Sequence, residues 1–196
     1  IIEDVDGYMW FGTSEGINRY DGHTIKIYAL LPKTGIFAGD LIRDIVQDAE
    51  KNLWILRRDY LHCIYYETEK IATYELSIIA DRKIGLSATK DKGVLLLSGK
   101  SILKYNATIN TPDTLFHNTN SRFSSITRGK NGRIYIGKEN GSLVICDERS
   151  KPIDEVFVAP QSNILNLCSD EDENLWVVTE NKGIWKFSSN KQLEQI

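Results

Sequence analysis

A large apolar anchor residue recurs at nearly constant spacing along the whole chain. Trp10, Trp54 and Trp176 lie in similar surroundings, and Leu95 and Tyr135 hold the same place in two weaker copies between them. The intervals between successive anchors are 44, 41, 40 and 41 residues. A steady period near 40 residues is typical of repeat proteins, so we expect five similar structural units.

Each unit has the pattern of four short strands. In the first unit a turn at 4–7 precedes an apolar run at 9–11, and alternating segments at 17–20 and 25–28 flank an Asp21-Gly22 hairpin signal. Upstream of the later anchors lie further apolar segments, at 42–46, 84–88, 123–127 and 164–168. Four antiparallel strands every forty residues are typical of one blade of a β-propeller.

The predicted fold class is therefore all-β: a β-propeller of four-stranded antiparallel blades. One propeller region covers residues 1–196. Its five blade units are placed approximately at residues 1–30, 38–76, 82–116, 121–158 and 162–196. Leucine-rich repeats have a shorter period, helical repeats need a 3.6-residue apolar pattern, and a plain β-sandwich does not explain the anchor spacing.

The chain begins within what should be the first strand of a blade, which favours part of a larger propeller over a closed ring of five. The outer faces of the first and last units would then lack neighbours. We expect those faces to carry Met9, Phe11, Trp185 and Phe187. An exposed apolar face of this kind tends to find a partner.

The charge of the chain is nearly balanced. It has 24 basic and 27 acidic residues, a net charge of -3, and no block of basic residues that would neutralise phosphates. Direct contact with nucleic acid is therefore not expected. No apolar run approaches the roughly 20 residues that a membrane-spanning helix needs.

The cysteines and histidines offer no recognisable chemical site. The cysteines are Cys63, Cys146 and Cys168, which lie in different units without metal-ligand spacing, and we expect buried free thiols. The histidines, His23, His62 and His117, are equally scattered, and no Gly-rich phosphate loop follows a strand. We predict no catalytic residue, no metal site and no cofactor.

The repeat itself resembles a known one. Residues 3–21 read E-D-x-x-G-x-x-W-F-G-T-x-x-G-I-x-R-Y-D, which closely resembles the two-component regulator propeller repeat. The fifth unit, from Asp170 to Ile184, also matches well. The second unit departs at Arg57-Arg58-Asp59, where the repeat has a Gly-Thr turn. The third and fourth units have Thr89 and Gly129 in place of the aspartate.

This resemblance implies a non-catalytic sensor propeller of a hybrid two-component signalling receptor in bacteria that digest polysaccharides. It also implies that the five units are part of a seven-bladed propeller. The implied location is the periplasm, with the membrane anchor and the histidine kinase in segments outside this sequence. The implied partners are an oligosaccharide ligand, neighbouring propeller blades or domains, and a second receptor copy in a homodimer.

Two other functions remain open at this point. A general scaffold propeller would bind proteins or peptides on one face. A carbohydrate-active propeller enzyme would hold its carboxylates on separate blades, where the sequence does not reveal them. A downstream membrane helix and kinase in the same gene would favour the sensor.

Residues that recur in every blade are interpreted as structural, because every blade needs them. We therefore expect the five anchors to pack between blades and Asp4, Asp48 and Asp170 to make turns. A binding site is built from what differs between blades. We look for it at the entry face, the end of the propeller where second-to-third-strand turns and blade-to-blade connections meet.

The entry face carries the candidate ligand-binding residues. They are Phe37, Asp40, Arg43, Arg57, Arg58, Tyr60, His117 and Arg122. Aromatic rings stack on the apolar faces of sugars, and the planar fork of arginine matches a carboxylate, so this set suits an acidic sugar.

Overall fold

The computed structural model describes residues 1–14, 16–28, 41–76, 83–90, 92–106, 109–117, 120–188 and 192–196. Within these ranges the secondary structure consists of twenty strands in five four-stranded antiparallel sheets. The all-β propeller prediction is confirmed.

The strands of each sheet follow one another in chain order. The first sheet contains β1 (Ile2–Glu3), β2 (Met9–Gly12), β3 (Ile17–Tyr20) and β4 (Ile25–Tyr28). The second contains β5 (Asp44–Gln47), β6 (Leu53–Leu56), β7 (Tyr60–Ile64) and β8 (Ile71–Glu75). The third contains β9 (Lys83–Ala88), β10 (Gly93–Ser98), β11 (Ser101–Asn106) and β12 (Ile109–His117). The fourth contains β13 (Phe123–Arg128), β14 (Ile134–Lys138), β15 (Ser142–Cys146) and β16 (Pro152–Phe157). The fifth contains β17 (Ile164–Ser169), β18 (Leu175–Thr179), β19 (Ile184–Phe187) and β20 (Leu193–Gln195).

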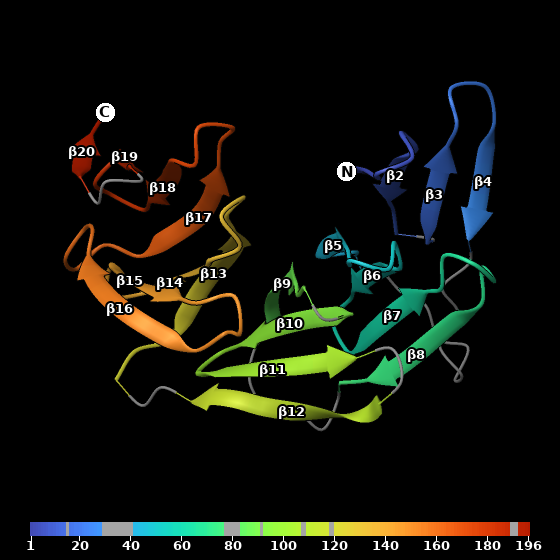
Figure 1. Ribbon diagram of the computed structural model, residues 1–196, viewed down its shortest axis with the longest axis horizontal. Coiled ribbons are helices and arrows are strands. Elements are labelled where there is room, and N and C mark those ends of the chain that lie inside the picture. Colours follow the sequence, from blue (N-terminus) through green and yellow to red (C-terminus); the bar gives the residue numbers. More distant parts are fainter. Residues whose placement is uncertain are drawn as a thin grey trace.

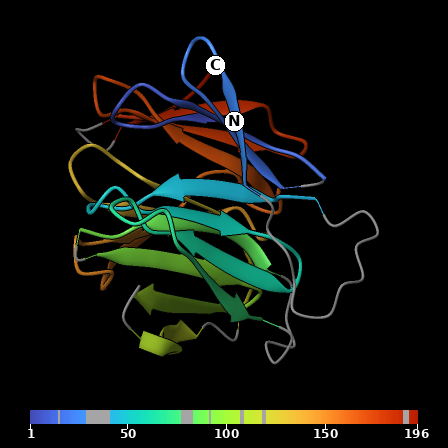
Figure 2. The ribbon, with the colours of Figure 1, turned by 90° about the vertical axis from the view of Figure 1, so that its right-hand side faces the viewer.

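The five sheets are arranged as an arc around a common centre (Figure 1). The first strands β5, β9, β13 and β17 contact one another in succession on the inside, and the fourth strands β8, β12 and β16 lie on the outside. The first and fifth sheets form the two ends of the arc. Both chain termini lie on the same open side of the molecule (Figures 1 and 2).

The hydrophobic core is divided into four clusters, each between two successive sheets. Strand β6 shows how this works. Leu53 and Ile55 belong to the cluster shared with the first sheet, whereas Trp54 and Leu56 belong to the cluster shared with the third. Alternate side chains of a strand point to opposite faces, so one apolar run contributes to two interfaces.

All five anchors lie in the second strand of their sheet. Trp10, Trp54, Leu95 and Tyr135 are buried against the following sheet. Trp176 points in the same direction from β18, but it is only half-buried because the fifth sheet ends the arc.

The outer faces of the arc differ in part from the expectation. Met9 and Phe11 are half-buried and alternate with Trp10, so they lie on the outer face of the first sheet, as expected. The expectation for Trp185 and Phe187 is wrong. They pair with Val177 and Leu175, and all four side chains belong to the cluster with the fourth sheet or pack against it.

The outer face of the fifth sheet carries Trp176, Val178 and Ile184 instead. Side chains along a strand alternate between its two faces, so an error of one position in assigning the strand assigns every side chain to the wrong face. Cys63 and Cys146 are buried free thiols, as predicted, but Cys168 is exposed. It pairs with Trp176 and therefore shares this outer face.

The exposed face of the first sheet leads to a prediction about association. Ile25 and Ile27 are 65% and 71% exposed on that face, and an apolar patch at the end of the arc favours self-association. We expect the purified chain to scatter light above its monomer mass of 22.3 kDa, in a concentration-dependent way. Ile25→Lys with Ile27→Lys should return it to the monomer mass.

Ile153→Lys is the matched control, since Ile153 is also exposed on a fourth strand, β16, but belongs to the fourth sheet, which is not at an end of the arc. Association should persist in that variant. A wild-type chain that stays monomeric at every concentration would contradict the prediction.

Candidate functional site

The repeated aspartate and tryptophan of the blade motif bind each other. The indole Nε1 donates to a carboxylate oxygen in three units: Trp10 to Asp4 at 2.7 Å, Trp54 to Asp48 at 2.8 Å, and Trp176 to Asp170 at 2.8 Å. This bond joins the first turn of a blade to its second strand. The motif therefore builds the scaffold in each of the three units.

The same carboxylates also close their turns. Asp48 Oδ1 accepts from the backbone N–H of Glu50 and of Asn52, both at 2.9 Å. Asp170 accepts from the Asn174 side chain and backbone as well as from Trp176, which lowers the pKa of Asp170 to about 2. Hydrogen bonds of this kind stabilise the charged form of a carboxyl group.

The two degenerate units replace this bond in different ways. In the third unit the side chain of Leu95 has no N–H to donate, so Thr89 can replace the aspartate without leaving a donor unpaired. In the fourth unit Asn131 Nδ2 donates to the Tyr135 hydroxyl at 3.2 Å. A Cβ at Gly129 would lie 2.9 Å from the Tyr135 ring. In the fourth unit Gly129 and Tyr135 therefore replace the aspartate and the tryptophan together, since the missing side chain at Gly129 leaves room for the Tyr135 ring.

Removing the motif carboxylate should cost stability. Asp48→Ala leaves the buried Trp54 indole and two turn N–H groups without their acceptor, and each unpaired buried donor costs about 1–3 kcal/mol. We expect a lower midpoint in urea unfolding. Asp48→Asn, which keeps one acceptor oxygen, should lose less. Equal losses in the two variants would contradict this role.

The units differ at the residue three positions after each anchor, at the entry face. Thr13 and Thr179 donate their hydroxyls to turn carbonyls at 3.0 and 2.7 Å. The second and fourth units have cations there, Arg57 and Lys138, and these are only 2% and 4% exposed. Lys138 Nζ lies 2.7 Å from a carboxylate oxygen of Glu155.

The structure gathers four of the predicted ligand-binding residues at one end of the second sheet. Arg43 N donates to Leu56 O at 2.8 Å, and Arg57 N donates to Tyr60 O at 2.9 Å. Arg43 and Arg58 are exposed, whereas Arg57 is buried within the sheet end. Phe37 and Asp40 lie outside the described residues.

The other two predicted residues lie on neighbouring sheets. His117 ends β12, where its Nδ1 hydrogen-bonds with Ser101 Oγ at 2.9 Å. Arg122 directly precedes β13 and is exposed. The carbonyl of Arg122 accepts from Glu139 N at 3.0 Å, which fixes its backbone against the β14–β15 turn.

Arg122 borders a hollow of about 230 Å³ at the entry face, between the third, fourth and fifth sheets. Glu139, Ser124 and Asn163 supply further polar groups, and Leu165, which is 51% exposed, supplies apolar surface. Ser124 Oγ and Asn163 Oδ1 are buried without a hydrogen-bond partner among the described residues. A bound ligand or water that reached them would satisfy these groups.

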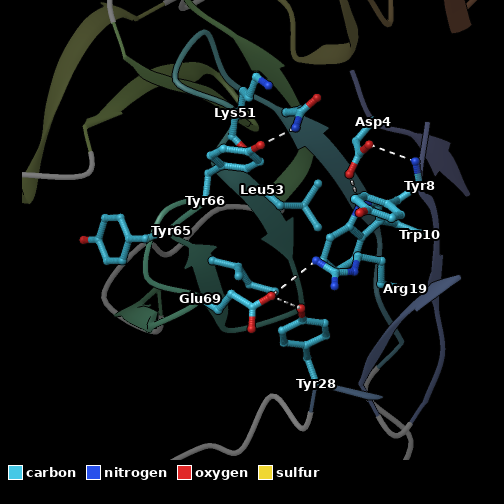
Figure 3. Close-up of a pocket in the computed structure, with 12 residues that line it drawn as sticks. Asp4, Tyr8, Trp10, Arg19, Tyr28, Lys51, Leu53, Tyr65, Tyr66 and Glu69 are labelled. Atoms are coloured by element: carbon cyan, nitrogen blue, oxygen red, sulfur yellow. Dashed lines mark hydrogen bonds and ion pairs between the residues drawn. The ribbon is translucent and has the colours of Figure 1, made fainter. Parts of the chain in front are cut away.

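A second pocket, of about 40 Å³, lies between the first two sheets and was not found from the sequence (Figure 3). The guanidinium of Arg19 lies over the rings of Tyr8 and Trp10, 4.6 and 5.7 Å from their centroids. Glu69 accepts from Arg19 at 3.3 Å and from the Tyr28 hydroxyl at 3.1 Å. The protein's own cation thus fills the space and joins β3 to the second sheet.

The residue that could have indicated this contact from the sequence is Arg19, the arginine of the R-Y-D segment at 19–21. In β3, Arg19 pairs directly with the anchor Trp10. Lys186 pairs with Trp176 in the same way, 5.6 Å from its ring. Glu69 also binds Lys26, and this contact lowers the pKa of Glu69.

Neither a group of metal-type side chains nor a membrane-spanning helix occurs in the described ranges. No three His, Cys, Asp or Glu side chains in these ranges are grouped as metal ligands. No helix long and apolar enough for a bilayer was found there.

Five successive blades, three of them with the Asp–Trp turn, define the chain as a β-propeller. No protein-family model and no curated protein matches its sequence. Among solved structures, an inactive variant of virginiamycin B lyase from Staphylococcus aureus, with quinupristin, superposes with a TM-score of 0.79 at 16% identity. That match covers 98% of this chain and 67% of the lyase.

Two surface or extracellular proteins are also similar. PorZ, a component of the type-IX secretion system of Porphyromonas gingivalis, has a TM-score of 0.71 at 14% identity, over 96% of this chain and 32% of PorZ. The extracellular domain of a hybrid two-component system from B. thetaiotaomicron has a TM-score of 0.64 at 16% identity, over 100% and 32% of the two chains. This chain thus spans about a third of each. At sequence identities this low, the structural similarity shows a shared fold and nothing further.

Proposed function

We propose that this chain is a ligand-recognition propeller of a hybrid two-component receptor, that it binds an oligosaccharide outside the cytoplasm, and that it performs no chemistry itself. The resemblance of residues 3–21 and 170–184 to the two-component regulator repeat supports the receptor class. The likeness to the extracellular domain of a hybrid two-component system is consistent with it.

The observation that carries the proposal is the entry-face hollow beside Arg122. It combines a cation, a carboxylate and an amide with the exposed apolar surface of Leu165. A sugar presents the complementary chemistry, since its hydroxyls need donors and acceptors while its C–H faces need apolar contact. An oligosaccharide laid across this hollow would contact three sheets at once.

Signalling would then follow from binding. A ligand that spans several blades favours one relative arrangement of the blades or of the receptor domains attached to them. The activity of the kinase in the homodimeric receptor would then depend on which arrangement is populated. The free energy of this shift in population cannot exceed the difference in the ligand's binding free energy for the two arrangements.

A panel of neutral and acidic oligosaccharides, measured by calorimetry, tests the proposal. Arg122→Ala should weaken the binding of any hit by about tenfold, because a hydrogen bond to a charged group is worth roughly 1.5 kcal/mol or more. Arg133→Ala is the matched control, since Arg133 is exposed in the turn at the other end of the same sheet.

Two results would count against the proposal. One is the absence of any hit in the panel. The other is a hit whose affinity falls equally with Arg133→Ala. Specific binding of a peptide at the entry face would favour the scaffold function instead.

A further inference from the structure

The first and fifth sheets each have one face on which no other sheet packs among the described residues. These two sheets flank the open side of the arc and do not pack on each other within one chain (Figure 1). The outer face of the first sheet carries Met9, Phe11, Asn18, Tyr20, Ile25 and Ile27. The outer face of the fifth sheet carries Cys168, Trp176, Val178, Ile184 and Lys186. Both faces are mainly apolar, and such faces favour association.

The outer face of the first sheet corresponds to the face that the second sheet turns towards the first. The residues directly before and after the anchor are Met9 and Phe11 in the first sheet, and Leu53 and Ile55 in the second. Leu53 and Ile55 are buried against the first sheet. The first sheet therefore presents the side of a blade interface that receives a preceding sheet.

The outer face of the fifth sheet corresponds to the opposite side of that interface. Trp176 pairs with Lys186, as Trp10 pairs with Arg19. The cation lies over the indole ring in both sheets, at 5.6 Å for Lys186 and 5.7 Å for Arg19. Ile184, two residues before Lys186, is 44% exposed. The fifth sheet therefore presents the side of a blade interface that packs on a following sheet.

The charges of the two faces are complementary at one turn. Between the first and second sheets, Arg19 binds Glu69 in the third-to-fourth-strand turn at 3.3 Å. The same turn of the first sheet contains Asp21, whose pKa is lowered to about 2 by hydrogen bonds from Thr24 and its neighbours. A carboxylate accepts several hydrogen bonds, so Asp21 can also accept from a lysine. Lys186 has the place from which a cation reaches this turn.

The charges at the first turns are less favourable. Asp6 of the first sheet pairs with Lys51 of the second at 2.8 Å. The corresponding residues of the fifth and first sheets are Asp172 and Gly7, which form no ion pair. Glu194 also lies opposite the lysine of β19 in the register. We therefore expect a contact that is reversible and depends on concentration.

We propose that the outer face of the fifth sheet binds the outer face of the first sheet of a second copy of this chain. The two sheets pack as the first and second sheets pack within one chain. Such a contact joins two different surfaces and leaves one face of each kind free in a pair of copies. It also supplies the partner for the exposed face that carries Ile25 and Ile27.

Two variants that each keep one face test the inference. Ile25→Lys with Ile27→Lys leaves only the fifth-sheet face, and Val178→Lys with Ile184→Lys leaves only the first-sheet face. Each variant should be monomeric by itself at concentrations where the wild type associates. An equimolar mixture should form a complex of about twice the monomer mass of 22.3 kDa, measured by light scattering.

The charge pair provides a second test. Lys186→Glu should weaken the association of the wild type by about tenfold, because a hydrogen bond between charged groups at Asp21 is replaced by repulsion. His23→Lys in the same chain should restore most of the affinity. It places a cation in the turn, and the turn itself uses only the backbone N–H of His23. Lys151→Glu, in the corresponding turn of the fourth sheet, is the matched control and should change nothing.

Three results would overturn the inference. The first is a mixture of the two face variants that stays monomeric. The second is either face variant associating by itself, which would show contact between two like faces. The third is a Lys186→Glu chain that associates as well as Lys151→Glu. The changed side chains are exposed or half-buried, so the urea midpoints should stay near that of the wild type. Should the lysine variants lose stability, the charge pair alone decides.

Discussion

Trp54→Ala lowers the free energy of unfolding by about 3–5 kcal/mol, the usual cost of truncating a buried aromatic side chain to alanine. Trp54 is completely buried between the second and third sheets, and its ring stacks on Tyr74 with centroids 5.8 Å apart. The variant also leaves Asp48 without its indole donor. For a chain of this size the melting temperature should fall by on the order of 10 °C.

Trp176→Ala provides a matched control for this result. Trp176 makes the same bond to its aspartate, at 2.8 Å, but its ring faces no further sheet among the described residues. The expected loss is about 1–2 kcal/mol, which is close to the value of the hydrogen bond alone. The difference between the two variants then measures packing between sheets, and equal losses would show that such packing contributes little.

Acidification destabilises the protein between about pH 6.5 and pH 4 through His62. This imidazole is buried, its Nδ1 hydrogen-bonds with Thr73 Oγ1 at 3.0 Å, and Nε2 has no partner among the described residues. Burial, followed by the charge of Arg57, lowers the pKa of His62 to about 4. The unfolded chain therefore binds a proton below about pH 6.5 that the folded chain does not bind until about pH 4.

The sign and size of this effect follow from the linkage relation. The contribution of His62 to the free energy of unfolding is fully present above about pH 6.5 and decreases as the pH falls. At pH 4 the loss is about 3 kcal/mol, because each pKa unit corresponds to about 1.4 kcal/mol. Urea unfolding at a series of pH values gives the measurement. His62→Gln removes the titration and should flatten the profile over this window.

Two carboxylates provide an internal reference for that experiment. Backbone and side-chain hydrogen bonds hold the pKa of Asp21 and of Asp170 at about 2. Their contribution is present above about pH 4 and is lost as the pH falls towards 2. This lower window should be unchanged in His62→Gln. If the stability of His62→Gln falls between pH 6.5 and pH 4 as steeply as that of the wild type, His62 is not the responsible group.

One departure from the repeat accompanies a hollow between the third and fourth sheets, whose lining includes Lys90, Lys104 and Arg149. The scaffold pairs, Asp with Trp and Arg with an aromatic cage, fill the space between the first two sheets (Figure 3). In the third unit Leu95 replaces the tryptophan, and the corresponding space before the fourth sheet is open and cationic. The repeat thus fills the space between two sheets where it is kept, and that space is open where the tryptophan is lost.

The sequence by itself determined the local structure. The anchor period predicted five four-stranded sheets, and alternation with turn residues placed the strands close to where they lie. The aspartates at 4, 48 and 170 were recognised as turn residues because their hydrogen bonds reach only two to six residues along the chain. Such short-range contacts leave a pattern in the sequence.

Only the tertiary structure decided which faces and which distant residues meet. Trp185 and Phe187 lie on the inner side of the fifth sheet because strand register, which one residue can reverse, sets the face. Lys104 and Arg149 share a hollow, although 45 positions separate them, because successive blades stack. The third unit has Leu95 where the first has Trp10, but only the position of the following sheet shows that a space lies beside this strand, so no local pattern records it.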